Sequence, residues 1–181
     1  SWQVQQQKFM NLPKNMDLDV DGYSRIYAAS WQGGGFRYTD TPFGHVAIVR
    51  PTDASKAAKF PNLAAASDAE LLTHLASRSQ VTRVHAMRTM VTRGSKPVFS
   101  EGLLAMAKSA DSARYVRVAA IMTLKQLDGA KAAGPIASLY GDAAIREFVL
   151  RALADRKDQL DGLPVDLFYQ GLEDTDPRVR L

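Results

Sequence analysis

Hydrophobic and polar positions follow two different patterns, and the change falls about one third of the way along the chain. Up to residue 62, short segments of alternating apolar and polar residues are separated by Gly, Pro and Asp, which is typical of strands and tight turns. From residue 63 onward, apolar residues recur three and four positions apart, which is typical of amphipathic helices. The sequence therefore predicts a β meander with its linker at 1–62 and helices at 63–181.

Three short strands are expected in the first region, at residues 16–20, 25–29 and 44–49. Asp21-Gly22 between the first two is a tight-turn signal, so we expect an antiparallel meander. A meander of this size has a limited hydrophobic face and is marginal alone. Its open edges therefore predict pairing with the helices or with a second copy of the chain, which would make a homo-oligomer.

The helical region repeats itself. Four arginines begin similar apolar segments at spacings of 34, 29 and 34 residues: Arg83, Arg117, Arg146 and Arg180. Further apolar segments lie between them, at residues 70–75, 103–107, 136–140 and 165–169. Each unit is thus a pair of helices, and such pairs stack because one pair cannot bury both its apolar faces. We predict a mainly α protein, an α-α superhelix of three units and a truncated fourth, preceded by the small antiparallel β meander.

Two motifs carry a family resemblance. Asp176-Pro-Arg-Val-Arg180 has an acidic residue, Pro, a spacer and Val-Arg, and Tyr115-Val-Arg-Val-Ala-Ala120 has Val-Arg before an alanine-rich helix. These segments resemble HEAT repeats of the short kind found in phycobilisome-lyase-type proteins, over about 115 residues. The resemblance implies that the repeated arginine reaches an acid of the preceding turn or of a neighbouring repeat and so connects successive units.

Acids stand at suitable places in two of the four units. Asp111 and Asp174 lie six residues before Arg117 and Arg180, as such a contact requires. Ser77 and Tyr140 occupy the equivalent positions in the other units. The alternative is that the arginine row binds phosphate or carboxylate. Four methionines at helical spacing are expected to fill gaps in the core: Met87, Met90, Met106 and Met122.

The first region carries a second resemblance. Met16-Asp-Leu-Asp-Val-Asp-Gly22, Arg25-Ile-Tyr-Ala-Ala-Ser-Trp31 and Gly44-His-Val-Ala-Ile-Val-Arg50 follow one another. They resemble the closing blade of a β-propeller, more narrowly the end of the sorbosone/glucose-dehydrogenase-like propellers of large secreted bacterial proteins. There, HEAT repeats and often a cytochrome c domain follow the propeller. The resemblance implies a periplasmic or secreted, quinone-dependent sugar dehydrogenase whose active site lies upstream, so no catalytic or cofactor-binding residue is carried over. We expect this chain to be a piece of a longer protein.

Composition excludes several classes of site. The chain has no cysteine, which rules out disulfides, thiolate metal sites and covalent haem attachment in this segment. Three histidines leave little material for an imidazole-rich metal site. At 46% hydrophobic and 23% charged residues, the composition is that of a globular protein. No apolar run approaches the roughly 20 residues of a transmembrane helix.

Charge argues against nucleic acid as the main partner. The net charge is +4, and residues 64–181 hold sixteen basic residues against fourteen acidic ones, well interleaved. Nucleic-acid binders usually concentrate their basic residues on one face. Because some HEAT-like glycosylases hold DNA in a basic concave face, this remains a lesser alternative. It would require four side chains to meet in a concavity: Arg83, Arg88, Arg93 and Lys96.

One motif suggests a metal. Asp17, Asp19 and Asp21 have the D-x-D-x-D-G form that opens a calcium loop. An EF-hand needs a bidentate Glu at the twelfth position, which here is Ala28. Strand alternation followed by an Asp-Gly turn explains the same letters without calcium, so both interpretations stay open.

Weighed together, these features favour a non-catalytic interaction or scaffolding module. The expected partner is another protein or an upstream domain of the same chain, and no cofactor is expected in the segment apart from the calcium hypothesis. The main alternative is the C-terminal part of a propeller dehydrogenase.

Overall fold

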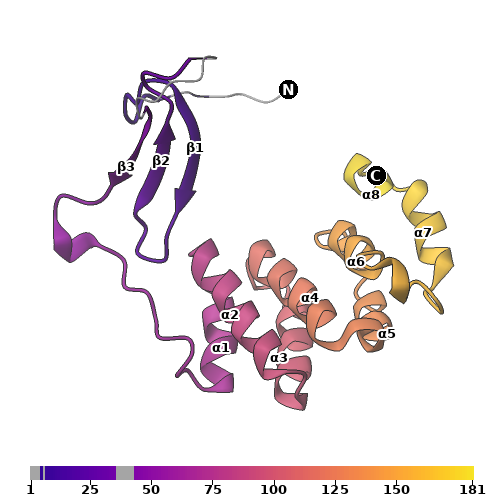
Figure 1. The fold of residues 1–181 in the computed structure, drawn as a ribbon. Helices are drawn as coiled ribbons and strands as arrows, with labels where there is room; N and C mark the ends of the chain where they lie inside the picture. The colour runs from indigo at the N-terminus through magenta and orange to yellow at the C-terminus, as the bar shows by residue number, and fades with distance from the viewer. Residues whose placement is uncertain (1–4, 6, 36–42) are drawn as a thin grey trace. The chain divides into compact units, whose positions relative to one another are not determined.

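The structure is a computed structural model that describes residues 5, 7–35 and 43–181. It is mainly helical with a small three-stranded antiparallel sheet, as the hydrophobic pattern predicts (Figure 1). The chain divides into two compact units, Ser1–Phe60 and Pro61–Leu181. The glycine-rich stretch before the third strand falls partly on residues 36–42, which lie outside the described residues.

The sheet of the first unit has the strand order β1-β2-β3. Its strands are β1 (Asn15–Val20), β2 (Ile26–Ser30) and β3 (His45–Val49). Leu18 pairs with Ala28, which pairs in turn with Ala47, and both pairings are antiparallel. Gly44 precedes β3 with φ +79°, and a Cβ there would lie 2.7 Å from the carbonyl oxygen of Ser30. The chain can enter β3 at this place only because the residue is glycine.

Asp21 organises the turn between β1 and β2. Its Oδ1 accepts the backbone N–H groups of Tyr23 and Arg25, each at 2.9 Å. Its Oδ2 accepts Arg25 Nε at 2.5 Å and the Tyr27 hydroxyl at 3.1 Å. The carboxylate therefore replaces water for two amides of the turn and also fixes the side chains of Arg25 and Tyr27.

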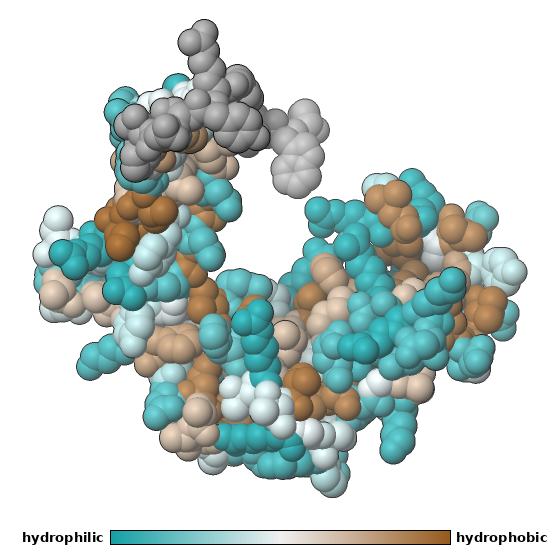
Figure 2. Space-filling model, viewed as in Figure 1, coloured by the Kyte–Doolittle hydropathy of each residue, from teal (hydrophilic) through white to brown (hydrophobic). Residues whose placement is uncertain are grey.

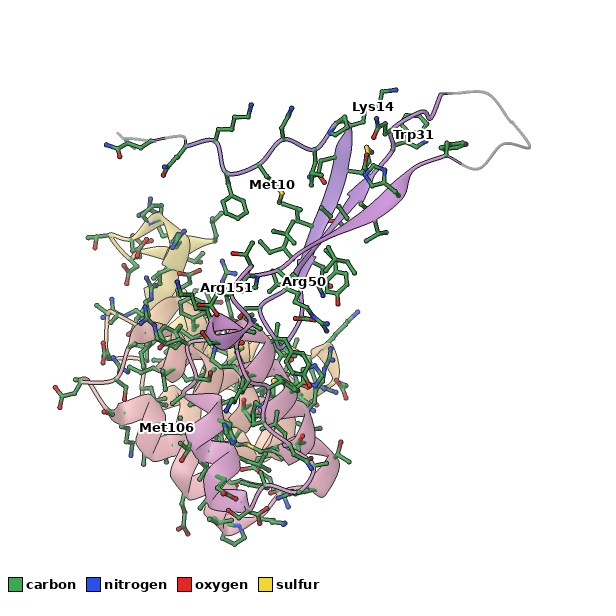
Figure 3. The ribbon with its side chains drawn as sticks, turned by 90° about the vertical axis from the view of Figure 1, so that its left-hand side faces the viewer. Met10, Lys14, Trp31, Arg50, Met106 and Arg151 are labelled. Carbon is green, nitrogen blue, oxygen red and sulfur yellow. The ribbon has the colours of Figure 1, made fainter. Side chains whose placement is uncertain are left out.

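Few residues of the sheet are buried. Ala28 is fully buried, but Leu18 is 53% exposed on one face, and Val46 and Ile48 are 62% and 56% exposed on the other. Brown side chains are accordingly visible over the strands in Figure 2. Lys14 lies over the ring of Trp31 at one end of the sheet, with Nζ 5.8 Å from the ring centroid (Figure 3). A short 3₁₀ helix, Ala54–Lys56, follows in the linker.

The second unit consists of helices taken in pairs along the chain. The pairs are α1 (Asp68–Leu75) with α2 (Gln80–Arg93), α3 (Pro97–Lys108) with α4 (Arg114–Asp128), α5 (Ala133–Ala137) with α6 (Arg146–Leu153), and α7 (Val165–Leu172) with α8 (Pro177–Arg180). Short 3₁₀ helices lie at Gly129–Ala132 and Lys157–Gln159. The second helices of the pairs contact one another in order, α2 with α4, α4 with α6, and α6 with α8.

Local signals in the sequence set the helix ends. Ser67 and Glu70 form a reciprocal capping box at the start of α1. Asp176 caps α8, where Pro177 is the first helical residue. Gly94 ends α2 with φ +82°. These signals satisfy backbone groups that a helix end would otherwise leave unpaired.

The core of this unit lies between the helices of each pair and between successive pairs. Its fully buried apolar side chains include Phe99, Leu71, Leu75, Met90, Leu103, Ile121, Leu124, Ile136 and Leu153. Met90 is thus a core residue, as expected. The expectation was wrong for Met87, Met106 and Met122, which are only partly buried, because the helices that carry them present these positions at the edge of the core.

Candidate functional site

The repeated arginines hold the loop between the two helices of a pair. Arg83 Nη1 donates to the carbonyl oxygen of Ser77 at 2.7 Å, and Arg146 Nε donates to that of Tyr140 at 3.0 Å. Arg180 Nη1 likewise donates to the carbonyl oxygen of Asp174 at 2.6 Å. The residue six positions earlier therefore acts through its backbone carbonyl. This explains why Ser77 and Tyr140 can stand where an acid was expected.

Carboxylates from the next unit complete two of these arginines. Arg117 Nη2 donates to Asp142 Oδ2 at 2.5 Å, and Arg146 Nη1 donates to Asp174 Oδ2 at 2.5 Å. Asp174 thus pairs with Arg146 through its side chain. Asp111, expected beside Arg117, is exposed and forms no ion pair with any described residue. Asp142 and Asp174 thus connect Arg117 and Arg146 forward to the following helix pair rather than back to their own turns.

Burial makes the first of these pairs unequal. The Arg117 side chain is 5% exposed, whereas that of Asp142 is 38% exposed. Arg117 Nε also donates to the carbonyl oxygen of Ala107 at 2.8 Å. The hydrogen bond from Arg117, together with one from the N–H of Ala144, lowers the pKa of Asp142 below its ordinary value of 3.8. Asp142 is therefore ionised at neutral pH.

A groove runs across the second helices of the pairs. We call it the second-helix groove; its lining residues used below are Arg83, Val84, Met87, Arg114, Tyr115, Val118, Met122, Phe148 and Arg178. They come from α2, α4, α6 and α8, and the groove has a volume of about 680 Å³. Its floor is apolar, with Val84, Met87, Val118 and Met122 half-buried along it.

Arginines and aromatic rings pair along this groove. The guanidinium of Arg83 lies 4.6 Å from the ring centroid of Tyr115, and that of Arg114 lies 5.1 Å from the ring of Phe148. In both cases an arginine of one unit covers a ring carried by the following unit. Such cation–π contacts hold the charge in place while leaving N–H groups at the edge of the guanidinium. Arg83 and Arg114 are thus held in place before any ligand arrives.

The sequence of α4 contains a signal for the groove, a second apolar stripe beside the one that faces the core. Helix α4 carries one apolar stripe in the core, with Ala120 and Leu124 buried. It carries a second stripe at Tyr115, Val118 and Met122, which lines the groove. A helix that is apolar on two separate faces has more apolar surface than one core contact can cover. That double stripe is visible in the residues alone.

The candidate calcium ligands do not converge. Asp17 and Asp19 each accept the N–H of the residue that follows, at 2.8 and 2.7 Å. Both carboxylate oxygens of Asp21 are used by the turn and its side chains. Among residues 5, 7–35 and 43–181, no three acidic or histidine side chains gather as a metal site. The calcium hypothesis therefore rests on the sequence spacing alone.

The four basic residues named for nucleic acid are dispersed. Arg93 Nη1 and Lys96 Nζ both bind the carboxylate of Asp68, each at 2.7 Å. Arg93 Nη2 also donates to the backbone carbonyl oxygen of Ala66, just before α1. Only Arg83 of the four lines the second-helix groove, and Arg88 is exposed elsewhere on α2.

Comparison with known proteins gives no relative. No family model, no curated protein and no solved structure matches the chain. Within the part of the chain that the structure describes, no helix combines the length and the apolar character needed to cross a membrane. The function is therefore inferred from the positions and contacts of the residues themselves.

Proposed function

We propose that Pro61–Leu181 is a HEAT-like superhelix that binds a protein partner along its second helices and performs no catalysis itself. The observation that carries the proposal is the second-helix groove, to which four successive units contribute. Stacked helix pairs expose an extended surface of this kind, and such surfaces are what repeat proteins use for binding.

The connections between units support the same proposal. Arg117–Asp142 and Arg146–Asp174 each join one unit to the next, while Arg83 and Arg114 stack on rings of the following unit. A groove formed by several units keeps its shape only if the units keep their relative positions. Arg117 and Arg146 are therefore proposed to support the binding surface, not to bind the ligand.

Panning a random peptide library against the complete 181-residue chain tests this function without assuming the ligand. The selected peptides are then measured against Met122→Gln, in the groove floor, and against Met106→Gln, on α3 outside the groove (Figure 3). Glutamine has nearly the shape of methionine but a polar end, so the floor variant is expected to weaken binding about fivefold. The control should bind like the wild type. Failure to enrich any peptide, or enrichment of peptides indifferent to Met122→Gln, would contradict the proposal.

One observation favours a second candidate for the first unit, the last blade of a propeller dehydrogenase with its active site upstream. Apolar side chains are exposed on both faces of the sheet, as in a blade that needs neighbours. Asp21, Arg25 and Tyr27 also contact one another at its first turn, which gives the Asp-Gly-x-x-Arg-x-Tyr spacing a structural reason to recur in each blade. Several such meanders encoded ahead of this chain would support this candidate, and an upstream region without them would contradict it.

A further inference from the structure

The charged residues that line the second-helix groove all have the same sign. Arg83, Arg114 and Arg178 line it, and no Asp or Glu does so. One of these arginines is paired with an acid outside the groove lining: Glu147, whose side chain is 6% exposed, is shared between Arg114, at 3.4 Å, and Arg151, at 2.9 Å. A groove that presents three cations to solvent attracts an anionic ligand.

These guanidinium groups have donors left for a ligand. Arg178 is exposed, and its side chain makes no hydrogen bond or ion pair with any residue the structure describes. Arg114 lies over the ring of Phe148 and donates one long hydrogen bond, at 3.4 Å, to Glu147. Arg83 is anchored through Nη1 by the carbonyl oxygens of Ser77 and Arg78, at 2.7 and 3.0 Å, and through Nη2 by Gln80 Oε1, which leaves its Nε–H and one Nη2–H for a ligand. Carboxylates are natural partners for such forks, because two of their oxygens match two parallel N–H groups.

The floor of the groove between the arginines is apolar, so it favours apolar ligand groups instead of anionic ones. Val84, Met87, Val118 and Met122 offer apolar atoms and no hydrogen-bonding side-chain group. A purely polar anion would leave this surface uncovered, whereas apolar side chains would gain the hydrophobic term on entering. Methionines in particular adapt to side chains of different shape.

We propose that the second-helix groove binds a short acidic protein segment, with its carboxylates on Arg83, Arg114 and Arg178 and its apolar side chains on the methionine floor. This inference rests on the proposed function and names the chemistry of its partner. Neighbouring packed helices lie about 8–10 Å apart, so crossing from Arg83 on α2 to Arg178 on α8, by way of α4 and α6, takes roughly 24–30 Å. An extended segment at about 3.3 Å per residue covers that distance with about eight residues.

Nucleic acid fits the same groove less well. A strand of that length would bring several phosphates and no aliphatic side chain, so it would use the rim and leave the floor uncovered. Nucleic-acid binding also draws on many cations along the backbone path, whereas Arg93 and Lys96 are already held by Asp68. We therefore argue for the acidic segment and make the oligonucleotide an arm of the test.

The test is fluorescence anisotropy with the full chain and a labelled peptide of alternating glutamate and leucine, about eight residues long, enough to span the groove. Three competitors separate the contributions: the same peptide with lysine for glutamate, with serine for leucine, and single-stranded oligothymidylate of similar length. Two groove variants, Arg178→Gln and Met122→Gln, are matched with Arg88→Gln on α2 and Met106→Gln on α3. Circular dichroism confirms that each variant is folded.

We expect the glutamate–leucine peptide to bind and each competitor to displace it poorly. Each groove variant should weaken binding about fivefold, from the loss of one charge-assisted contact or one apolar contact, and each control should leave it unchanged. Raising the ionic strength from about 0.05 M to about 0.5 M should weaken binding by about threefold or more, because salt screens exposed charges.

Several other outcomes overturn the inference. Preference for the lysine peptide, or for the oligonucleotide, reverses the assignment of the partner. Equal binding of the serine peptide removes the role of the floor. If the library selection yields groove-dependent peptides that are not acidic, the inference fails while the proposed function stands; if no groove-dependent peptide is found at all, both fail.

Discussion

The Arg117–Asp142 pair makes a quantitative prediction about how the helix pairs hold together. In Arg117→Met the guanidinium is lost and Asp142, 38% exposed, keeps its hydration. In Asp142→Ala the buried Arg117, 5% exposed, loses its acid and keeps only the carbonyl oxygen of Ala107. Leaving a buried charge without its partner is the costlier change. Asp142→Ala is therefore expected to destabilise the fold more than the 38% exposure of the Asp142 side chain would suggest.

The magnitude follows from the geometry. A hydrogen bond to a charged group contributes about 1.5–3 kcal/mol when its partners are shielded from water. Because water reaches Asp142, that value is reduced by screening, as for exposed ion pairs. We expect a coupling free energy of about 1–2 kcal/mol between the two positions in a double-mutant cycle.

Urea denaturation of the full chain, followed by far-UV circular dichroism, measures the four free energies of unfolding. Arg156–Asp155 is the control pair, because its atoms are 3.9 Å apart and its side chains are 46% and 40% exposed. Its coupling should not exceed about 0.5 kcal/mol. A coupling at Arg117–Asp142 no larger than that of the control would refute the claim that this pair connects successive units.

Two further predictions concern acid stability and helix capping. The pKa of Asp142 is lowered in the folded state, so the stability that ionised Asp142 contributes is complete above the ordinary pKa of 3.8 and is lost as the pH falls through the lowered pKa. Between about pH 4 and pH 2, Asp142→Asn should therefore lose stability less steeply than the wild type. An identical acid profile for the two proteins would argue against the contact. Ser67→Ala removes the hydroxyl that accepts the N–H of Glu70 at the start of α1, and it should lower the free energy of unfolding in urea by about 1 kcal/mol. Ser138→Ala is the control, because the Ser138 hydroxyl caps no helix start. Equal losses of stability in the two variants would contradict the capping role.

Local signals were enough to predict most of the fold. The strand alternation around Leu18 and the Asp21-Gly22 turn each act within a few positions, so the residues specify them directly. The spacing of the repeated arginines predicted the helix pairs and their unequal lengths. The short interval of 29 residues between Arg117 and Arg146 corresponds to a first helix, α5, of five residues where α3 has twelve.

The partners of the arginines could not be predicted in the same way. Asp142 lies 25 residues after Arg117, and Asp174 lies 28 residues after Arg146. Which acid meets which arginine depends on how one pair rotates and shifts against the next, and that is a property of packing between units. Met87 and Met122 were misassigned for a related reason, since helical spacing shows that a face is apolar but not what covers it.

The central claim is that the second-helix groove is the binding surface of this chain. The chain has six methionines, and their methyl groups give separate NMR signals that can be followed while the glutamate–leucine peptide is added to the 181-residue chain. Met87 and Met122 in the groove are expected to shift together with one dissociation constant, while Met106 on α3 and Met10 and Met16 in the first unit stay in place. Saturable shifts confined to Met106, Met10 or Met16, or no shift at any methionine, would contradict the claim.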